Sequence, residues 1–214
     1  MFATLRYKLR YNPPPRLLIN ALKRVGITIL PYYLTLRSVQ DTRSTLERSH
    51  CSLVELGPES MATIAAMPMA HASEAVYRQR LSLGQRCFGL MLDGRLVGYC
   101  WMDPARCSYG GEGFELADDE GYGFDIYTLP GERGRNLAPL LNACFSDRLE
   151  ELGIRRMYGV IDRYNRPSLR FAQKIGARRI RLNLYVNLFG LFEKSWMLRR
   201  YEDEPDHPDS SART

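Results

Sequence analysis

The chain has 214 residues, of which 45% are hydrophobic and 25% are charged, and its formal net charge at pH 7 is +6. These are the values of one globular domain that is able to bury a core. The five cysteines are scattered without a Cys-x-x-Cys pair, which argues against a disulfide framework and a zinc site and suits a reducing cytosol. No apolar run reaches membrane-spanning length and the first residues lack a signal-type apolar core, so we expect a cytoplasmic protein without metal.

Residues 1–50 are predicted to form a basic leader ahead of the main domain. They hold nine Lys and Arg residues against Asp41 and Glu47, and three consecutive prolines end the first extended stretch. Within residues 16–36, apolar side chains at helical spacing predict an amphipathic helix: Leu17, Leu18, Ala21, Leu22 and Val25. Such a basic helix can lie on an anionic inner-membrane surface, or it can dock on the domain or on a second subunit, and we favour docking.

A hairpin is expected in the first half of the main domain. The segments Arg86 to Leu92 and Arg95 to Asp103 are apolar and flank Asp93-Gly94, a strong signal for a two-residue turn. Downstream of this hairpin, residues 111–132 contain seven acidic residues and no Lys or Arg. That stretch is interpreted either as a wall that attracts a cationic amine or as a solvated acidic loop.

The segment from Tyr122 to Ala138 carries the most information about function. It is predicted to be a strand that ends in a Pro-Gly turn and leads directly into a helix from Leu137 to Leu152, which Gly153 terminates. Arg133-Gly134-Arg135-Asn136 precedes the helix, where the first N–H groups are unpaired and the helix dipole is positive. With two arginines beside it, this turn indicates a site for a pyrophosphate-bearing ligand.

Two shorter motifs follow in the second half of the chain. A strand is predicted near Arg156 to Ile161, followed by Asn165-Arg166-Pro167-Ser168 and a short helix that ends at Lys174-Ile175-Gly176-Ala177. Residues 133–200 hold fifteen basic residues against five acidic ones. No aromatic-interleaved recognition module accompanies them, so nucleic-acid binding is the weakest of the functions considered.

In combination, these motifs resemble the GCN5-related N-acetyltransferase (GNAT) family, over roughly residues 52–199. The family's loop reads Gln/Arg-x-x-Gly-x-Gly/Ala, and Arg133 to Ala138 fits except that Asn136 replaces a Gly. Asn tolerates left-handed backbone angles best after Gly, so the fit is weakened without being lost. The family also shows Asn-x-x-Ser/Ala before its fourth helix and Lys-x-Gly-Phe/Ala at that helix's end. Some bacterial members have a similar basic helical leader.

The resemblance implies an α/β fold whose mixed central sheet has six or seven strands flanked by helices. Its fourth and fifth strands splay apart to form the slot for acyl-CoA. We expect this domain to occupy residues 51–201, followed by a disordered acidic tail over residues 202–214.

The resemblance also implies the residues that bind the cosubstrate, acetyl-CoA or another acyl-CoA. Pantetheine would bond the strand at Ile126, Tyr127 and Thr128, and the pyrophosphate would lie on the loop of Arg133, Gly134, Arg135, Asn136, Leu137 and Ala138. Asn165 and Ser168 are further candidates for cofactor contact. For Asn165, capping of the following helix is the favoured role.

For catalysis, Asp125 is the predicted base, with Glu115 and Asp119 behind it, although strand alternation leaves the direction of Asp125 open. A backbone N–H near Ile126 or Tyr127 would polarise the thioester. The family's usual acid is a Tyr seven residues after the Asn, and this position is Ala172. The remaining donors, which can equally be structural, are Tyr164, Tyr127 and Ser168.

The predicted function is acyl-CoA-dependent N-acyltransfer, most simply acetyl transfer, to the primary amine of a small molecule or amino sugar. One alternative is an acyltransferase that takes its acyl group from an acyl carrier protein and acts on an envelope precursor. Another is a non-catalytic acyl-CoA-binding regulatory module. The protein could also form a homodimer.

Overall fold

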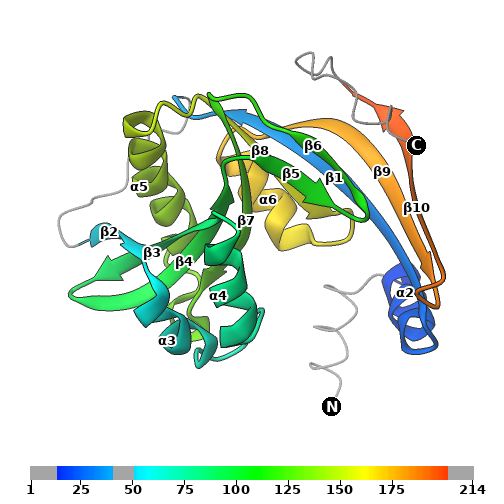
Figure 1. Cartoon of the computed structure of the whole chain (residues 1–214), viewed down its shortest axis with the longest axis horizontal. Coiled ribbons are helices and arrows are strands. Elements are labelled where there is room, and N and C mark those ends of the chain that lie inside the picture. Colours follow the sequence, from blue (N-terminus) through cyan, green and yellow to red (C-terminus); the bar gives the residue numbers. More distant parts are fainter. Residues whose placement is uncertain (1–13, 41–50, 202–214) are drawn as a thin grey trace.

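The computed structural model describes residues 14–40 and 51–201, and the predicted tail over residues 202–214 lies outside them. A mixed sheet of eight strands, in the order β10-β9-β1-β8-β7-β4-β3-β2, forms the centre of the molecule (Figure 1). Its strands are β1 (Ile27–Ser38), β2 (Cys51–Leu56), β3 (Arg86–Leu92), β4 (Arg95–Asp103), β7 (Glu120–Thr128), β8 (Arg156–Asp162), β9 (Arg178–Leu188) and β10 (Phe192–Arg200). The sheet thus has more than the six or seven strands expected.

Helices and a small hairpin lie around this sheet. The helices are α2 (Pro14–Arg24), α3 (Met61–Ala65), α4 (Glu74–Ser82), α5 (Leu137–Glu151) and α6 (Arg166–Lys174), and two short 3₁₀ turns cover Pro58–Ser60 and Pro130–Glu132. Strands β5 (Arg106–Tyr109) and β6 (Glu112–Glu115) pair with each other as a separate hairpin. No helix in the described parts of the chain is long and apolar enough to cross a membrane.

The leader differs from the predicted amphipathic helix through residue 36. Helix α2 ends at Arg24, Gly26 adopts a positive φ of 83°, and β1 then pairs with both β8 and β9. The physical reason is composition, since residues 27–35 are rich in the β-branched and aromatic side chains that favour strands. A strand from the predicted leader therefore lies inside the sheet.

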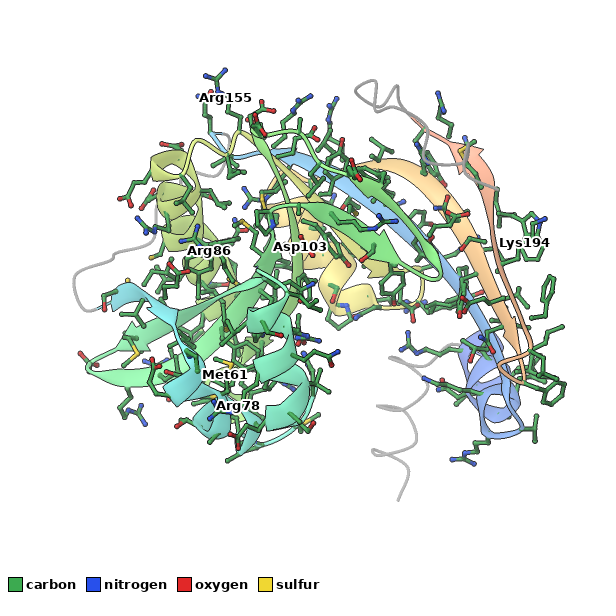
Figure 2. All side chains as sticks on the ribbon, in the orientation of Figure 1. Met61, Arg78, Arg86, Asp103, Arg155 and Lys194 are labelled. Atoms are coloured by element: carbon green, nitrogen blue, oxygen red, sulfur yellow. The ribbon has the colours of Figure 1, made fainter. Side chains whose placement is uncertain are left out.

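The long strands β1, β9 and β10 extend away from the rest as a curved arm, with α2 at its far end (Figure 1). Figure 2 shows Lys194 on this arm, and Met61 and Arg78 on the opposite side of the view. Helix α2 is docked on the domain, because Arg16 Nη1 donates to Asp162 Oδ2 at 2.8 Å.

The core has a layer on each face of the sheet. On one face, α5 buries Leu141, Phe145 and Leu149 against Phe88 and Met157. On the other face, α3 and α4 bury Met61, Ile64 and Tyr77 against aromatic residues of β4 and β7. The expected β3–β4 hairpin is confirmed, with positive φ at both Asp93 (48°) and Gly94 (74°) in its turn.

Candidate functional site

Strands β7 and β8 separate partway along their length. They pair in parallel from Glu120 with Arg156 to Gly123 with Gly159. Beyond that point β7 continues to Thr128 and β8 continues to Asp162, with no ladder pairing between them in the described residues. The edge of β7 over residues 124–128 is thus open on this side. Its backbone N–H and C=O groups can hydrogen-bond an extended ligand.

A β-bulge lies where the two strands separate. On the other side of β7, Trp101 pairs with Phe124 and Tyr99 pairs with Tyr127, so that Asp125 and Ile126 together oppose one residue of β4. Asp125 has a φ of 53°, in the left-handed region. A bulge of this kind redirects a side chain out of the regular alternation, which is why the sequence pattern left the direction of Asp125 open.

The loop after β7 provides an anion site at the start of α5. Gly134 has a φ of 86° and Asn136 a φ of 58°, which confirms that Asn136 takes the left-handed conformation. Asn136 occupies the N-cap position, but its side chain makes no capping hydrogen bond. The first-turn N–H groups of α5 therefore depend on another acceptor, such as a phosphate. A Cβ built on Gly131 or Gly134 would meet nothing within 4 Å, so the loop has open space above it.

The two loop arginines are exposed, but one of them already has a carboxylate partner. Glu132 accepts hydrogen bonds from Arg135 and, at 3.2 Å, from Arg95. The bond from Arg135, followed by that from Arg95, lowers the pKa of Glu132, so this carboxylate is ionised at neutral pH. A bound phosphate must therefore compete with Glu132 for Arg135, a feature that the loop motif does not reveal.

Asp125 is buried and bonded at both carboxylate oxygens. His71 Nδ1 bonds Oδ1, Arg80 Nη1 donates to Oδ2 at 2.5 Å, and only 7% of the Asp125 side chain is exposed. Burial alone would raise the pKa of Asp125, but the hydrogen bonds from His71 and Arg80 outweigh it and hold the pKa below its ordinary value. A carboxylate engaged in this way is a weak proton acceptor.

An aromatic wall surrounds Arg80. Its guanidinium lies 5.1–5.3 Å from the ring centroids of Tyr77, Trp101 and Phe124, within cation–π range. Behind these rings, Tyr99 stacks on Tyr127 with centroids 4.9 Å apart. The Nε1 of Trp101 is buried and has no hydrogen-bond partner among the described residues.

The hydroxyl of Tyr127 holds the loop between α3 and α4. It donates to the backbone oxygen of Pro68 at 2.7 Å, and the backbone N–H of Ala72 donates to the Tyr77 hydroxyl at 3.1 Å. These two bonds tie the chain on each side of His71 to β7 and α4. The hydroxyl of Tyr127 thus has a structural role, as a hydrogen-bond donor to the backbone.

The other predicted catalytic residues are not joined to Asp125. Glu115 is exposed on β6 and Tyr164 is half-buried after β8, and no hydrogen bond or ion pair links either to Asp125 within the described residues. Asp119 instead receives a bond from Arg156 at 3.1 Å. Asn165 Oδ1 accepts from the backbone N–H of Ser168 at 3.2 Å, which confirms the predicted capping of α6.

Sequence reasoning missed His71 and Arg80. They lie 54 and 45 residues before Asp125, and no local spacing relates them to it. Only the packing of the α3–α4 loop and of α4 against β7 brings them together.

One cavity in the described part of the chain is lined by none of the predicted site residues. A cavity of about 460 Å³ lies between β2 and α5, lined among others by Cys51, Glu55, Cys144 and Arg148. It is separate from the open edge of β7 and from the loop before α5.

Comparison with known families agrees with the geometry. Residues 59–177, more than half of the chain, match the model described as "Acetyltransferase (GNAT) family". The chain therefore belongs to the GNAT acetyltransferases, and the predicted family and α/β fold are confirmed. No protein of curated function matches it significantly.

Solved structures resemble the chain at low sequence identity. A Drosophila protein is 19% identical (TM-score 0.54, covering 81% of this chain and 56% of that one). A GCN5-related N-acetyltransferase from Kribbella flavida is 14% identical (TM-score 0.51, covering 80% and 63%). A fungal glucosamine N-acetyltransferase region within a multi-domain β-N-acetylglucosaminidase is 13% identical (TM-score 0.57, covering 81% and 23%). The chain thus spans less than two thirds of each of these proteins, and the likeness concerns the fold.

Proposed function

We propose that the protein is an acyl-CoA-dependent N-acyltransferase that moves an acetyl group to the primary amine of a small molecule or amino sugar. One observation carries the proposal. The open edge of β7 over residues 124–128 leads directly into the arginine-flanked loop at the start of α5. An extended group on the edge and a pyrophosphate on the loop are the two halves that an acyl-CoA would supply.

The residues present fit that cosubstrate. Backbone groups of Ile126, Tyr127 and Thr128 would hold pantetheine, while the amides over residues 134–138 and the Arg133 and Arg135 side chains would hold the pyrophosphate. Acyl-CoA, when bound, supplies the activated thioester. The backbone N–H of Ile126, at the bulge, would donate to the thioester oxygen as charge develops on it.

The acceptor side is proposed to be the face that carries the acidic segment. Glu112 and Glu115 lie exposed on β6 and would attract a cationic amine. Tyr164 is kept as the proposed proton donor to the leaving thiolate, with Glu115 as a polar contact for the amine.

One observation favours a second candidate, a non-catalytic acyl-CoA-binding module. Ala172, at the position where the family's usual Tyr would lie, is buried in α6 and cannot donate a proton. Binding would then persist without turnover.

Amine-dependent release of CoA distinguishes the N-acyltransferase from the non-catalytic binding module. Wild type is incubated with acetyl-CoA and, separately, with glucosamine, spermidine or lysine, and both the free thiol and the mass of the acetylated amine are measured. Thiol release that requires one of the amines supports the N-acyltransferase. Binding of acetyl-CoA without release for any amine favours the non-catalytic module, and absence of both points to an acyl carrier protein as donor.

A further inference from the structure

We propose that His71, oriented by Asp125, is the group that takes the proton from the attacking amine. The proposal rests on the acyltransferase function above and gives the base role to a residue that no sequence motif indicates. It makes Asp125 a positioning residue, whose carboxylate fixes the imidazole ring.

The bonding of Asp125 sets the tautomer of His71. Arg80 on Oδ2 keeps the carboxylate ionised, and an ionised carboxylate can only accept hydrogen bonds. His71 must therefore donate to Oδ1 from Nδ1–H, which leaves the lone pair of the neutral ring on Nε2. In other enzymes, too, a carboxylate bonded to Nδ1–H orients a histidine that accepts a proton at Nε2.

The exposure of the two side chains separates their roles. Asp125 is 7% exposed, whereas His71 is 46% exposed, and no hydrogen bond engages its Nε2 within the described residues. An amine from solvent can therefore reach the histidine and not the carboxylate.

The groups that face this pair come from four elements. The charged groups at this site are Asp125 itself, on β7, and Arg80 on α4. The other titratable side chains around it are Tyr77 on α4, Tyr99 on β4, Tyr127 on β7 and Cys87 on β3. Burial, above all, raises the pKa of Tyr99 and of the Cys87 thiol, so both stay neutral at working pH. Of these groups, His71 is the exposed one that offers a ring nitrogen to solvent.

The position of His71 relates it to the thioester site. Its ring lies edge-on to Tyr127, with centroids 5.8 Å apart. Asp125 and Tyr127 flank Ile126, whose N–H is the proposed donor to the thioester oxygen. The loop that carries His71 is fixed to this strand by the bond from Tyr127 to Pro68. His71 thus stands beside the bulge where acceptor and donor would meet.

Acyl transfer removes two protons from the acceptor ammonium. The acceptor ammonium gives one proton to His71 Nε2, which becomes imidazolium and later releases that proton to solvent. The neutral amine attacks the thioester carbon, so that a C–N bond forms and the C–S bond breaks. The thiolate of CoA leaves and takes a proton from the Tyr164 hydroxyl, which is restored by the second nitrogen proton, giving amide, free thiol and one released proton.

His71→Asn separates this role from simple anchoring of the loop. The Asn amide can still donate to Asp125, but it lacks the second nitrogen. We expect acetyl-CoA affinity within twofold of wild type, kcat lower by about 10²- to 10³-fold, and loss of the acidic limb of the kcat/KM–pH profile. Met69→Ala, which changes an exposed residue of the same loop, is the matched control and should leave all three unchanged. Added imidazole should partly restore His71→Ala.

A second measurement needs no acceptor. Nitrogen-15 NMR of the free protein should find neutral His71 protonated at Nδ1, and Asp125→Asn should reduce that preference. Protonation at Nε2 instead, or a His71→Asn rate and pH profile within threefold of wild type, would overturn the proposal. Absence of acetyl-CoA binding by wild type would overturn the proposed function. That outcome is distinguishable from failure of the His71 proposal, because the tautomer is measured on the free protein without cosubstrate.

Discussion

Gly134 and Asn136, both with left-handed backbones, shape the loop that precedes α5. At Asn136 the side chain forms no capping bond, so its value to the fold is backbone tolerance rather than capping. The free-energy cost of a left-handed backbone is lower for Asn than for other non-Gly residues, and it is lowest for Gly.

Replacing Asn136 therefore gives a first prediction. Asn136→Ala should lower the free energy of unfolding by about 1 kcal/mol, because Ala carries the steric cost of a positive φ without compensation. Asn136→Gly should stay within about 0.5 kcal/mol of wild type. Urea denaturation measures both, and equal stability of the Ala and Gly variants would contradict the backbone explanation.

Asp125 gives a second prediction, which concerns pH. Its pKa in the folded protein is lowered, so its ionised form stabilises the fold above the unfolded pKa, about 3.9, and this contribution is lost as the pH falls through the folded value. The stability difference between wild type and Asp125→Asn should therefore be largest at pH 6 and shrink below about pH 4.

Urea titrations at several pH values measure this difference. Glu115→Gln, at an exposed carboxylate, is the control and should show little change across the same range. A wild-type advantage over Asp125→Asn that is equally large at pH 3.5 and pH 6 would exclude the proposed ion pairing.

At the scale of elements, the contact between β4 and β7 holds the open edge in place. A Cβ on Gly98 of β4 would lie 2.7 Å from the backbone oxygen of Tyr127, which cannot rotate away. Gly98→Ala should thus push the strands apart, cost about 1–3 kcal/mol of stability and weaken acetyl-CoA binding.

Gly131→Ala is the matched control for this third prediction, since its Cβ would meet nothing within 4 Å. Thermal unfolding and calorimetric binding read out the two effects. Unchanged stability and affinity in Gly98→Ala would show that β4 does not set the position of the β7 edge.

Local features of the elements were predictable from the sequence, and distant pairings were not. The start of α5, the Asp93-Gly94 turn and the Asn165 cap each depend on neighbouring residues. The bond of His71 to Asp125 depends instead on the packing of a loop 54 residues away, and the bulge arises from the register between β4 and β7. Neither leaves a local spacing signal.

At the scale of the whole molecule, β1 extends the folded unit toward the N-terminus, because this strand is part of the central sheet. It lies between β9 and β8, with ladder pairing on both sides. Residues 27–38 fall within the predicted leader, over residues 1–50, but they form this strand of the sheet. Without β1, the edges of β8 and β9 would be left unpaired and apolar side chains such as Ile180 would lose their cover.

A fourth prediction follows for truncated chains. Residues 51–201 alone should lack a cooperative thermal transition, whereas residues 14–201 should unfold cooperatively near the temperature of the full chain. Circular dichroism against temperature compares the two. Cooperative unfolding of the shorter chain at the same temperature would show that β1 is dispensable.

Calorimetric titration with acetyl-CoA tests the acyl-CoA slot most directly, comparing wild type with the double variant Arg133→Ala/Arg135→Ala. Arg200→Ala, which removes an exposed arginine of β10, serves as the control. We predict binding that the control retains and the double variant weakens at least about tenfold, because hydrogen bonds to charged groups contribute about 1.5–3 kcal/mol each. Absence of binding to wild type, or equal affinity in wild type and the double variant, would contradict the assignment of the β7 edge and its loop as the cosubstrate site.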